Sequence, residues 1–337
     1  MTALSSVLIV DDEPAVRDLM ARWVSALGLR SHTVANADEA LETMRRRHYD
    51  LAVIDVMMPG RDGLWLAGEL QREHPHTAVV LASAYSALLG GDAQKPVADF
   101  LVKPFPRERF VLAVDRGRQW RKQTLEEMHW HAMLSLELRD RAAAVSATIA
   151  ERAAHGADEA TALHALALSR IKETAAHGER VARYAQSVAR QMGIHDDLEL
   201  LALAAQFHDI GKIAIPDALV TKPSPLTRGE VAIMRQHVDI GAEILEATAT
   251  LAGAAPLVLA SHEWFNGGGY PHQLAGDAIP IASRIIAVVD AYDAMTQDRA
   301  YRSRFNSADA VAELLRCSPA QFDPKIVAAF LAVLGKH

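Results

Sequence analysis

The sequence is poor in cysteine, in net positive charge and in long apolar runs. A single cysteine, Cys317, excludes an intramolecular disulfide framework and a thiolate metal cage, and it suits a reducing compartment. The formal net charge of -7 excludes a general basic field for nucleic acid or anionic lipid, so any phosphate-bearing ligand must be held by local cations. No apolar run reaches the roughly 18 residues of a membrane span, and the N-terminus "MTALSSVLIVDDE" lacks the basic region of a signal peptide. We therefore expect a cytoplasmic protein without membrane insertion.

The chain does contain enough apolar material for packed cores. Its 337 residues, 50% of them hydrophobic, predict roughly two domains. From residue 7 to about 115, short β-rich runs such as "VLIV" and "LAVID" alternate with helical stretches, which predicts an α/β doubly wound parallel sheet. After residue 118 the strand patterns stop, and the rest of the chain reads as helices.

A connecting helix is predicted between the two parts. No Gly or Pro interrupts the chain from Arg118 to His155, so one helix could run for much of that distance. Its apolar residues keep no strict heptad, although the helix could pair between the subunits of a homodimer. We place the first domain at 1–120, the connecting helix at 121–160 and the second domain at 161–337.

Acidic residues follow two strands of the predicted sheet. Asp11 and Asp12 follow "VLIV", and Asp55 ends "LAVID". The functional crevice of such a sheet lies beyond the carboxyl ends of its strands. Three carboxylates converging there repel one another unless a cation lies among them, and Mg²⁺ with positions left open for phosphate oxygens is the natural occupant. Ser83 and Lys103, at two later strand ends, add a hydroxyl and a cation suited to a phosphoryl group.

The motifs "VDDE", "DVMMPGRDG", "LASA" and "DFLVKPF" resemble the receiver domain of two-component response regulators. The resemblance covers about residues 5 to 120 and implies a flavodoxin-like fold. It implies that Asp55 accepts a phosphoryl group, that the three carboxylates hold Mg²⁺, and that Ser83 and Lys103 contact the phosphoryl group. A sensor histidine kinase is the implied partner.

A second polar cluster, "FHDIGK", lies within the apolar run "LLALAAQFHDIGKIAI". If this segment is helical, Lys212 lies at i+4 from His208 and at i+3 from Asp209, so that all three face one cavity. Burying such groups is costly unless they are paired. A lone His–Asp pair is more often a structural hydrogen bond than a metal site. More candidate ligands lie elsewhere in this half of the chain: Glu173, His177, His237, His262, Glu263 and Asp290.

Imidazole and carboxylate ligands without thiolate suit Fe, Mn, Ni or Zn better than Mg. The set is larger than one ion uses, and a carboxylate such as Asp209 could bridge two ions. Paired ions can clamp the attacking and departing oxygens of a phosphoryl displacement. The pattern therefore favours phosphoryl chemistry at a site with more than one metal ion.

The order of these motifs, which ends with "GGGYP" and "DAMTQDRAYR", is similar to the HD-GYP family over roughly residues 165 to 335. Members of that family are metal-dependent phosphodiesterases that hydrolyse cyclic di-GMP. The resemblance implies an all-α HD-type helical domain with two or three divalent metal ions. The implied metal ligands are His177, His208, Asp209, His237, His262 and Asp290, with Glu173 as an extra ligand for a third ion. The implied substrate contacts are Lys212, which is also a candidate proton donor, Tyr270, Arg299 and Arg302.

Two positions depart from the family pattern. Ser261 stands where a further His is usual, and Asn266 stands where the loop usually has Asp. The loss of an imidazole predicts one metal position that is weak, empty or completed by water. Our main interpretation is a response regulator whose phosphorylation controls a cyclic di-GMP phosphodiesterase, with Asp209 and Lys212 as its catalytic residues.

Three alternatives stay open beside that interpretation. A catalytically silent cyclic di-GMP receptor or protein-interaction module would bind nucleotide without turnover. Hydrolysis of a related cyclic or linear dinucleotide is the second alternative. A DNA-binding regulator is disfavoured, because the chain is acidic and has no basic recognition helix.

Overall fold

A computed structural model describes residues 5–84, 97–170, 172–297 and 305–335, with the side chains of 172–174 excepted. The chain forms two compact units, Met1–Trp130 and His131–His337. The predicted substrate contacts Arg299 and Arg302 lie outside the described residues, as does the side chain of Glu173.

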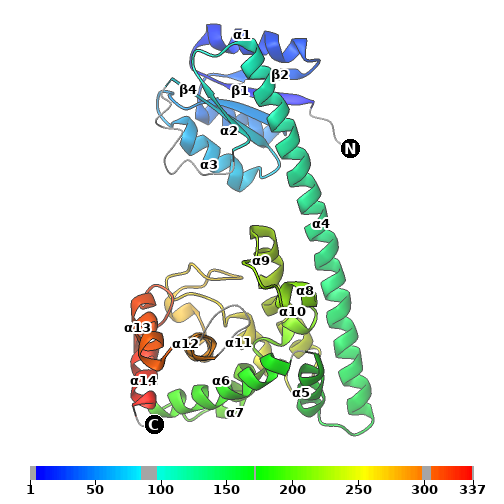
Figure 1. Ribbon diagram of the computed structural model, residues 1–337, viewed down its shortest axis with the longest axis vertical. Coiled ribbons are helices and arrows are strands. Elements are labelled where there is room, and N and C mark those ends of the chain that lie inside the picture. The colour runs from blue at the N-terminus through cyan, green and yellow to red at the C-terminus, as the bar shows by residue number, and fades with distance from the viewer. Residues whose placement is uncertain (1–4, 85–96, 171, 298–304, 336–337) are drawn as a thin grey trace. The chain divides into compact units, whose positions relative to one another are not determined.

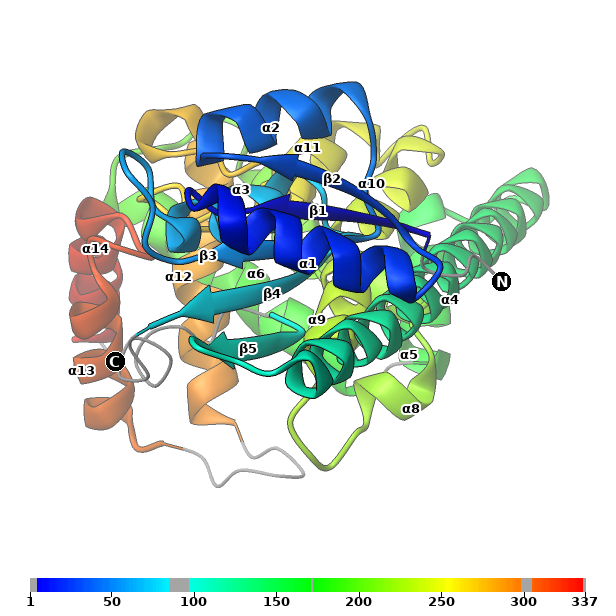
Figure 2. The same ribbon diagram turned by 90° about the horizontal axis from the view of Figure 1, so that it is seen from above.

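The described part of the first unit contains a five-stranded parallel sheet with the strand order β2-β1-β3-β4-β5 (Figure 2). The strands are β1 (Ser6–Val10), β2 (Arg30–Val34), β3 (Leu51–Asp55), β4 (Ala78–Ser83) and β5 (Asp99–Val102). Their order and direction confirm the predicted doubly wound sheet.

Helices cover both faces of this sheet, because successive strand side chains point to opposite sides. In β1, Leu8 and Val10 pack in the same core as α2 (Ala37–Arg46) and α3 (Gly63–Glu73). Val7 and Ile9 pack instead with α1 (Pro14–Ala26) and the start of α4 (Arg107–Ala154). A continuous apolar strand is therefore buried on both sides, as parallel sheets require.

Residues 121–154 of the predicted connecting helix belong to α4, which spans 48 residues (Figure 1). The helix ends at Ala154, where a turn at Gly156 separates it from α5 (Glu159–Arg170), so it is shorter at this end than the predicted 121–160. Its N-terminal turns belong to the first unit, where Phe110 and Val114 are buried. Leu138 and Ala142 belong to the core of the second unit. Among the described residues, no helix combines the length and the apolar composition that crossing a membrane requires.

The second unit is largely helical over its described residues, which agrees with the predicted all-α domain. After α4 come α5 (Glu159–Arg170), α6 (Lys172–Gln191), α7 (Leu198–Phe207), the 3-10 helix η2 (Ile210–Ile213), α8 (Asp217–Val220), α9 (Arg228–Arg235) and α10 (His237–Glu246). The remainder consists of η3 (Ala252–Ala254), α11 (Ala255–Leu259), η4 (Gly276–Ala278), α12 (Ile281–Thr296), α13 (Ser307–Cys317) and α14 (Pro324–Leu334).

Two glycines allow unusually close backbone contacts in this unit. A Cβ atom on Gly178 of α6 would overlap the carbonyl oxygen of Gln206 in α7. A Cβ atom on Gly211 of η2 would overlap the carbonyl oxygen of His237 in α10. Gly178 follows His177, and Gly211 lies two residues after Asp209. The close contacts at these glycines therefore bring together the parts of α6, α7, η2 and α10 that carry candidate ligands.

Candidate metal centres

The first set of candidate ligands combines three helices. His177 comes from α6, His208 follows the last residue of α7, and Asp290 comes from α12. One ligand atom from each residue lies within 4.8 Å of the other two. The Nε2 atom of His177 is 2.9 Å from Oδ1 of Asp290, and Nε2 of His208 is 3.6 Å from the same oxygen. These three side chains can hold one cation.

The hydrogen bonds of His208 fit such a role. Its Nδ1 atom donates to the carbonyl oxygen of Ala205 at 2.8 Å, so in the neutral ring the lone pair is on Nε2. The side chain is 1% exposed, and within the described part of the chain Nε2 has no hydrogen-bond partner. A buried acceptor without a donor is costly. A metal ion at this position would satisfy it.

The second set consists of Asp209, His237 from α10 and His262. Nδ1 of His237 donates to the carbonyl oxygen of Met234 at 2.8 Å, which leaves Nε2 as an acceptor in the neutral ring. That Nε2 atom lies 3.2 Å from Oδ1 of Asp209 and 3.2 Å from Nε2 of His262. An acceptor facing a carboxylate oxygen is repulsive unless a proton or a cation lies between them. The donor set therefore fits a second metal ion.

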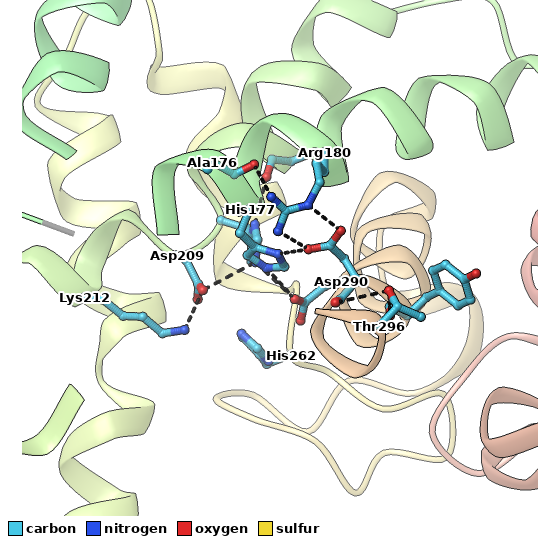
Figure 3. A network of polar contacts seen from close by, with 12 residues as sticks. Ala176, His177, Arg180, Asp209, Lys212, His262, Asp290 and Thr296 are labelled. Atoms are coloured by element: carbon cyan, nitrogen blue, oxygen red, sulfur yellow. Dashed lines mark hydrogen bonds and ion pairs between the residues drawn. The ribbon is translucent and has the colours of Figure 1, made fainter. Parts of the chain in front are cut away.

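The two sets meet at Asp209. Its Oδ1 atom faces His237, whereas its Oδ2 atom lies 3.7 Å from Nε2 of His208 in the first set. Figure 3 shows Asp209, His262 and Asp290 pointing toward the same space beside His177. Asp209 thus has the position that a carboxylate bridging two ions would need.

The segment "FHDIGK" is not a single α-helix. The helix α7 ends at Phe207, and Lys212 lies in the 3-10 helix η2, for which Asp209 is the N-cap. The expected i+3 contact still forms, because residues three apart align in a 3-10 helix. Nζ of Lys212 is 2.5 Å from Oδ2 of Asp209 (Figure 3).

Neighbouring charges keep both carboxylates ionised. Burial alone would raise the pKa of Asp209, but Lys212 and His208 hold this pKa well below its usual range. Burial would likewise raise the pKa of Asp290, but the hydrogen bond from His177 and the nearby imidazole of His208 lower this pKa well below the usual range. An ionised carboxylate is the form that binds metal.

The imidazoles respond to the same charges in opposite ways. Burial alone would lower the pKa of His177, but hydrogen bonds to Asp290 and Asp293 raise it to about 9. The carboxylates around His177 therefore stabilise a positive charge at this place. That charge can be a proton on the imidazole or a metal ion beside it. Burial and the nearby His237 lower the pKa of His262 to about 3. His262 is therefore neutral at neutral pH, as a metal ligand must be.

Two residues that the sequence analysis missed hold His177 in place. Oδ2 of Asp293 is 2.6 Å from Nδ1 of His177, and Asp293 also accepts hydrogen bonds from Nε and Nη2 of Arg180, each at 2.8 Å. A carboxylate behind a ligating histidine fixes the orientation and tautomer of the ring. The available signal was the spacing of Asp290 and Asp293, because residues at i and i+3 share one face of α12.

The first unit gathers its predicted site residues at the carboxyl edge of the sheet. Asp11, Asp12 and Asp55 form a third potential metal-binding set. Nζ of Lys103 lies 2.8 Å from Oδ2 of Asp11 and 2.8 Å from Oδ2 of Asp55. Ser83, the last residue of β4, is buried, and its carbonyl oxygen accepts a hydrogen bond from the backbone N–H of Lys103 at 2.8 Å. Asp12 alone among these residues is exposed.

Burial raises the pKa of Asp55. Lys103 lowers this pKa through a hydrogen bond and its charge, and Asp11 raises it, so that the resulting value is above the usual one. A cation bound at this edge would neutralise part of the carboxylate charge that Lys103 now neutralises, and Lys103 could then contact a phosphoryl oxygen.

Comparison with known proteins assigns both units. Residues 7–115 match the family model described as response regulator receiver domain, and residues 161–326 match the model described as HD domain. Over 338 residues the chain is 32% identical to the cyclic di-GMP phosphodiesterase response regulator RpfG of Xanthomonas campestris, covering 97% of this chain and 87% of that protein. The chain belongs to the family of response regulators that carry an HD phosphodiesterase domain.

Other relatives of this response regulator carry related names. A protein of Thermotoga maritima named cyclic di-GMP phosphodiesterase is 30% identical over 331 residues, which cover 97% of this chain and 89% of that protein. The 3'3'-cGAMP-specific phosphodiesterase 2 of Vibrio cholerae is 37% identical over 166 residues, which cover 48% of this chain and 32% of that protein.

In the HD domain, Tyr270 lies against the second set. Its ring stacks on that of His262 with the centroids 5.2 Å apart and an interplanar angle of 6°. The guanidinium carbon of Arg235 is 4.7 Å from the centroid of Tyr270. The motif order predicts Tyr270 but not Arg235, although Arg235 stands two residues before His237.

The loop that carries Tyr270 is held by the residue after His262. Glu263 is buried, and its carboxylate accepts hydrogen bonds from the backbone N–H groups of His272 at 2.6 Å and Leu274 at 3.1 Å. The sequence pattern includes Glu263 among the possible ligands. The described structure places its carboxylate on the loop backbone, and Glu263 is in neither histidine-containing set.

The two departures from the family pattern make local hydrogen bonds. The buried hydroxyl of Ser261 donates to the carbonyl oxygen of Val258 at 2.7 Å. Oδ1 of Asn266 accepts from the backbone N–H of Gly268 at 2.9 Å.

Proposed function

We propose that this response regulator hydrolyses cyclic di-GMP at a multinuclear metal site, and that phosphorylation of Asp55 controls the reaction. The observation that carries the proposal is the pair of abutting ligand sets, in which the two carboxylate oxygens of Asp209 face different sets. The printed names of the Xanthomonas and Thermotoga relatives, which align with nearly the whole chain, support cyclic di-GMP as the substrate.

Each set would hold one divalent ion, with Asp209 bridging them. Bound Fe, Mn, Ni or Zn ions would activate water for attack on phosphorus and neutralise the charge that develops on the phosphate oxygens. Lys212 stands beside Asp209, with its side chain 25% exposed, so its ammonium group can contact the phosphate and give a proton to the departing 3′ oxygen. Tyr270 would contact the nucleotide from the side of His262.

Further predictions from the sequence complete this proposal. Arg299 and Arg302 would contact phosphate or guanine, and Glu173 would bind a third ion. In the receiver domain, Asp11, Asp12 and Asp55 would hold Mg²⁺, while Ser83 and Lys103 bind the phosphoryl group that a sensor histidine kinase supplies. We retain the domain boundaries 1–120, 121–160 and 161–337, with the connecting helix as the dimerisation element.

A catalytically weak or silent cyclic di-GMP receptor is the second candidate function. It is favoured by Ser261, whose hydroxyl is engaged with Val258 and leaves the second set with three protein ligands. Such a receptor would bind cyclic di-GMP about as tightly as an active phosphodiesterase does, but it would release the nucleotide unchanged.

The test begins with the metal content of the purified full-length protein. Product chromatography with cyclic di-GMP and Mn²⁺ or Fe²⁺ follows, with 3′3′-cGAMP as a parallel substrate. We expect Asp209→Asn to lose bound metal and turnover together while its helical content stays unchanged. An Asp209→Asn protein with full metal content and full rate would exclude the bridging role. Nucleotide binding by the metal-loaded wild type without any product would favour the receptor.

A further inference from the structure

Arg235 connects the protein surface to the second ligand set. It is the last residue of α9 and is exposed, and its guanidinium group lies over the ring of Tyr270. Tyr270 in turn stacks on His262, whose Nε2 atom lies 3.2 Å from that of His237. Arg235 is also joined to this set through the chain, because only Gln236 separates it from His237.

Arg235 keeps N–H donors available, because the residue is exposed and its guanidinium carbon lies over the ring of Tyr270. A guanidinium group stacks through its face, whereas its N–H donors point outward in its plane. Within the described residues, two other arginines of the HD domain differ from Arg235 in this respect. Arg180 pairs with Asp293 and Arg284 pairs with Asp323, but no carboxylate of the described chain lies within ion-pair distance of Arg235.

A cyclic dinucleotide needs more than one such cation. It carries two phosphodiester groups, and a chain with a formal net charge of -7 offers no general positive field for them. Lys212 is beside Asp209 and therefore serves the phosphate that reacts. The other phosphate needs a donor besides Lys212. Arg235 reaches the second set through Tyr270 and offers a guanidinium fork that suits phosphate oxygens, with Arg299 and Arg302 left for guanine or for further phosphate contacts.

We propose that Arg235 is a substrate-binding residue that holds the non-reacting phosphate of the cyclic dinucleotide, with Tyr270 fixing the direction of its guanidinium group. This inference rests on the proposed function, since it assigns a second anchoring point for the same substrate. Arg235 would add affinity for dinucleotides and would contribute nothing to a substrate with a single phosphate.

The experiment compares two substrates and three variants of the full-length protein with Mn²⁺. The substrates are cyclic di-GMP and bis(p-nitrophenyl) phosphate, which has one phosphodiester group. The variants are Arg235→Ala, Arg235→Lys and the control Arg228→Ala, which removes an exposed arginine from the first position of the same helix. Metal content, KM, kcat and the Kd for cyclic di-GMP from calorimetry are measured for each protein.

We expect Arg235→Ala to raise KM and Kd for cyclic di-GMP roughly 10- to 100-fold, the usual effect of losing a charge-assisted hydrogen bond. Its kcat, its metal content and its rate with bis(p-nitrophenyl) phosphate should stay at the level of Arg228→Ala. Arg235→Lys should recover part of the affinity, because a phosphate accepts a hydrogen bond from either cation.

Three results would overturn the inference. An Arg235→Ala protein that binds cyclic di-GMP as tightly as Arg228→Ala has lost no substrate contact. Equal losses with both substrates, together with lost metal, would mean that Arg235 only supports His237. No recovery in Arg235→Lys would point to the guanine edge instead of a phosphate. A wild type that binds cyclic di-GMP without hydrolysing it would reject the proposed activity, while the Kd series would still decide the role of Arg235.

Discussion

Replacing Asp293 by Asn tests whether the residues behind His177 control the affinity of the first metal set. The carboxylate accepts three N–H groups, one from His177 and two from Arg180, at distances between 2.6 and 2.8 Å. An amide of the same size has one acceptor oxygen and one NH₂ group. In Asp293→Asn at least one of the three donors therefore faces another donor, and the negative charge between His177 and Arg180 is gone.

The magnitude follows from this arrangement. Loss of a carboxylate that orients a ligating histidine typically weakens metal binding about 10- to 100-fold, which corresponds to about 1.4 to 2.8 kcal/mol. Arg180 keeps access to water, because 30% of its side chain is exposed. The loss of folding stability should consequently lie near the lower end of the roughly 1.5 to 3 kcal/mol found for hydrogen bonds to charged groups.

The assay is a titration of Mn²⁺ against a chelator of known affinity, with thermal unfolding of the metal-free proteins as a second measurement. Asp196→Asn removes an exposed carboxylate in the same unit and serves as the control. We expect only Asp293→Asn to show weaker metal binding. If Asp293→Asn unfolds at a lower temperature but binds Mn²⁺ with the affinity of the control, Asp293 stabilises the fold alone and our account of His177 is wrong.

Three further changes test other parts of the molecule. Ser261→His should bind the second metal ion more tightly and reach half-maximal rate at less metal, whereas Ser261→Ala should lose about 1 kcal/mol of unfolding free energy. Full metal occupancy of the wild type, with no gain in Ser261→His, would contradict this. Acetyl phosphate with Mg²⁺ should label the wild type but not Asp55→Asn, and labelling should change the phosphodiesterase rate or dimerisation; labelling with neither change would mean that the two units are uncoupled. Gly211→Ala should separate η2 from α10, lose about 1 to 3 kcal/mol of stability and weaken metal binding. The exposed Gly335→Ala, whose Cβ would lie 3.6 Å from the nearest atom, should do neither; equal stability and metal affinity in the two variants would refute the close contact.

The sheet could be predicted because its signal is local. The runs at β1 and β3 are apolar along their whole length and are buried at every position, which is typical of parallel strands covered on both faces. The acidic residues beyond them needed only the rule that parallel strands end at one edge of the sheet. The pairing of Lys103 with both Asp11 and Asp55 follows from the same geometry.

The residues that support the site could not be predicted in this way. Arg180 and Asp293 are 113 positions apart, and their contact depends on how α6 packs against α12. The contact of Arg235 with Tyr270 likewise depends on where a long loop returns to the end of α9. Motif spacing indicates which residues bind a metal, whereas the packing of whole helices decides which residues hold those ligands in place.

In "FHDIGK" the contact between two side chains could be predicted from the sequence, but the type of helix could not. An α-helix and a 3-10 helix both place Asp209 beside Lys212, so the i+3 contact could be predicted without the correct backbone. The tighter helix arises where Gly211 lies against the carbonyl group of His237, a contact between segments that no local pattern contains. That contact sets how far Asp209 stands from His237.

Ser261 affects both the end of α11 and the ligands available to the second metal set. Its backbone N–H and its hydroxyl both donate to the carbonyl oxygen of Val258, in the last turn of α11, where carbonyl groups lack partners within the helix. The serine thus completes the end of a helix at a position where the family usually supplies an imidazole. The second set then depends on His237, His262 and Asp209, whose Oδ2 atom lies 3.7 Å from Nε2 of His208 in the first set. Because an ion in the first set would draw Asp209 away from Lys212 and fix its orientation, occupancy of the second set should rise with occupancy of the first.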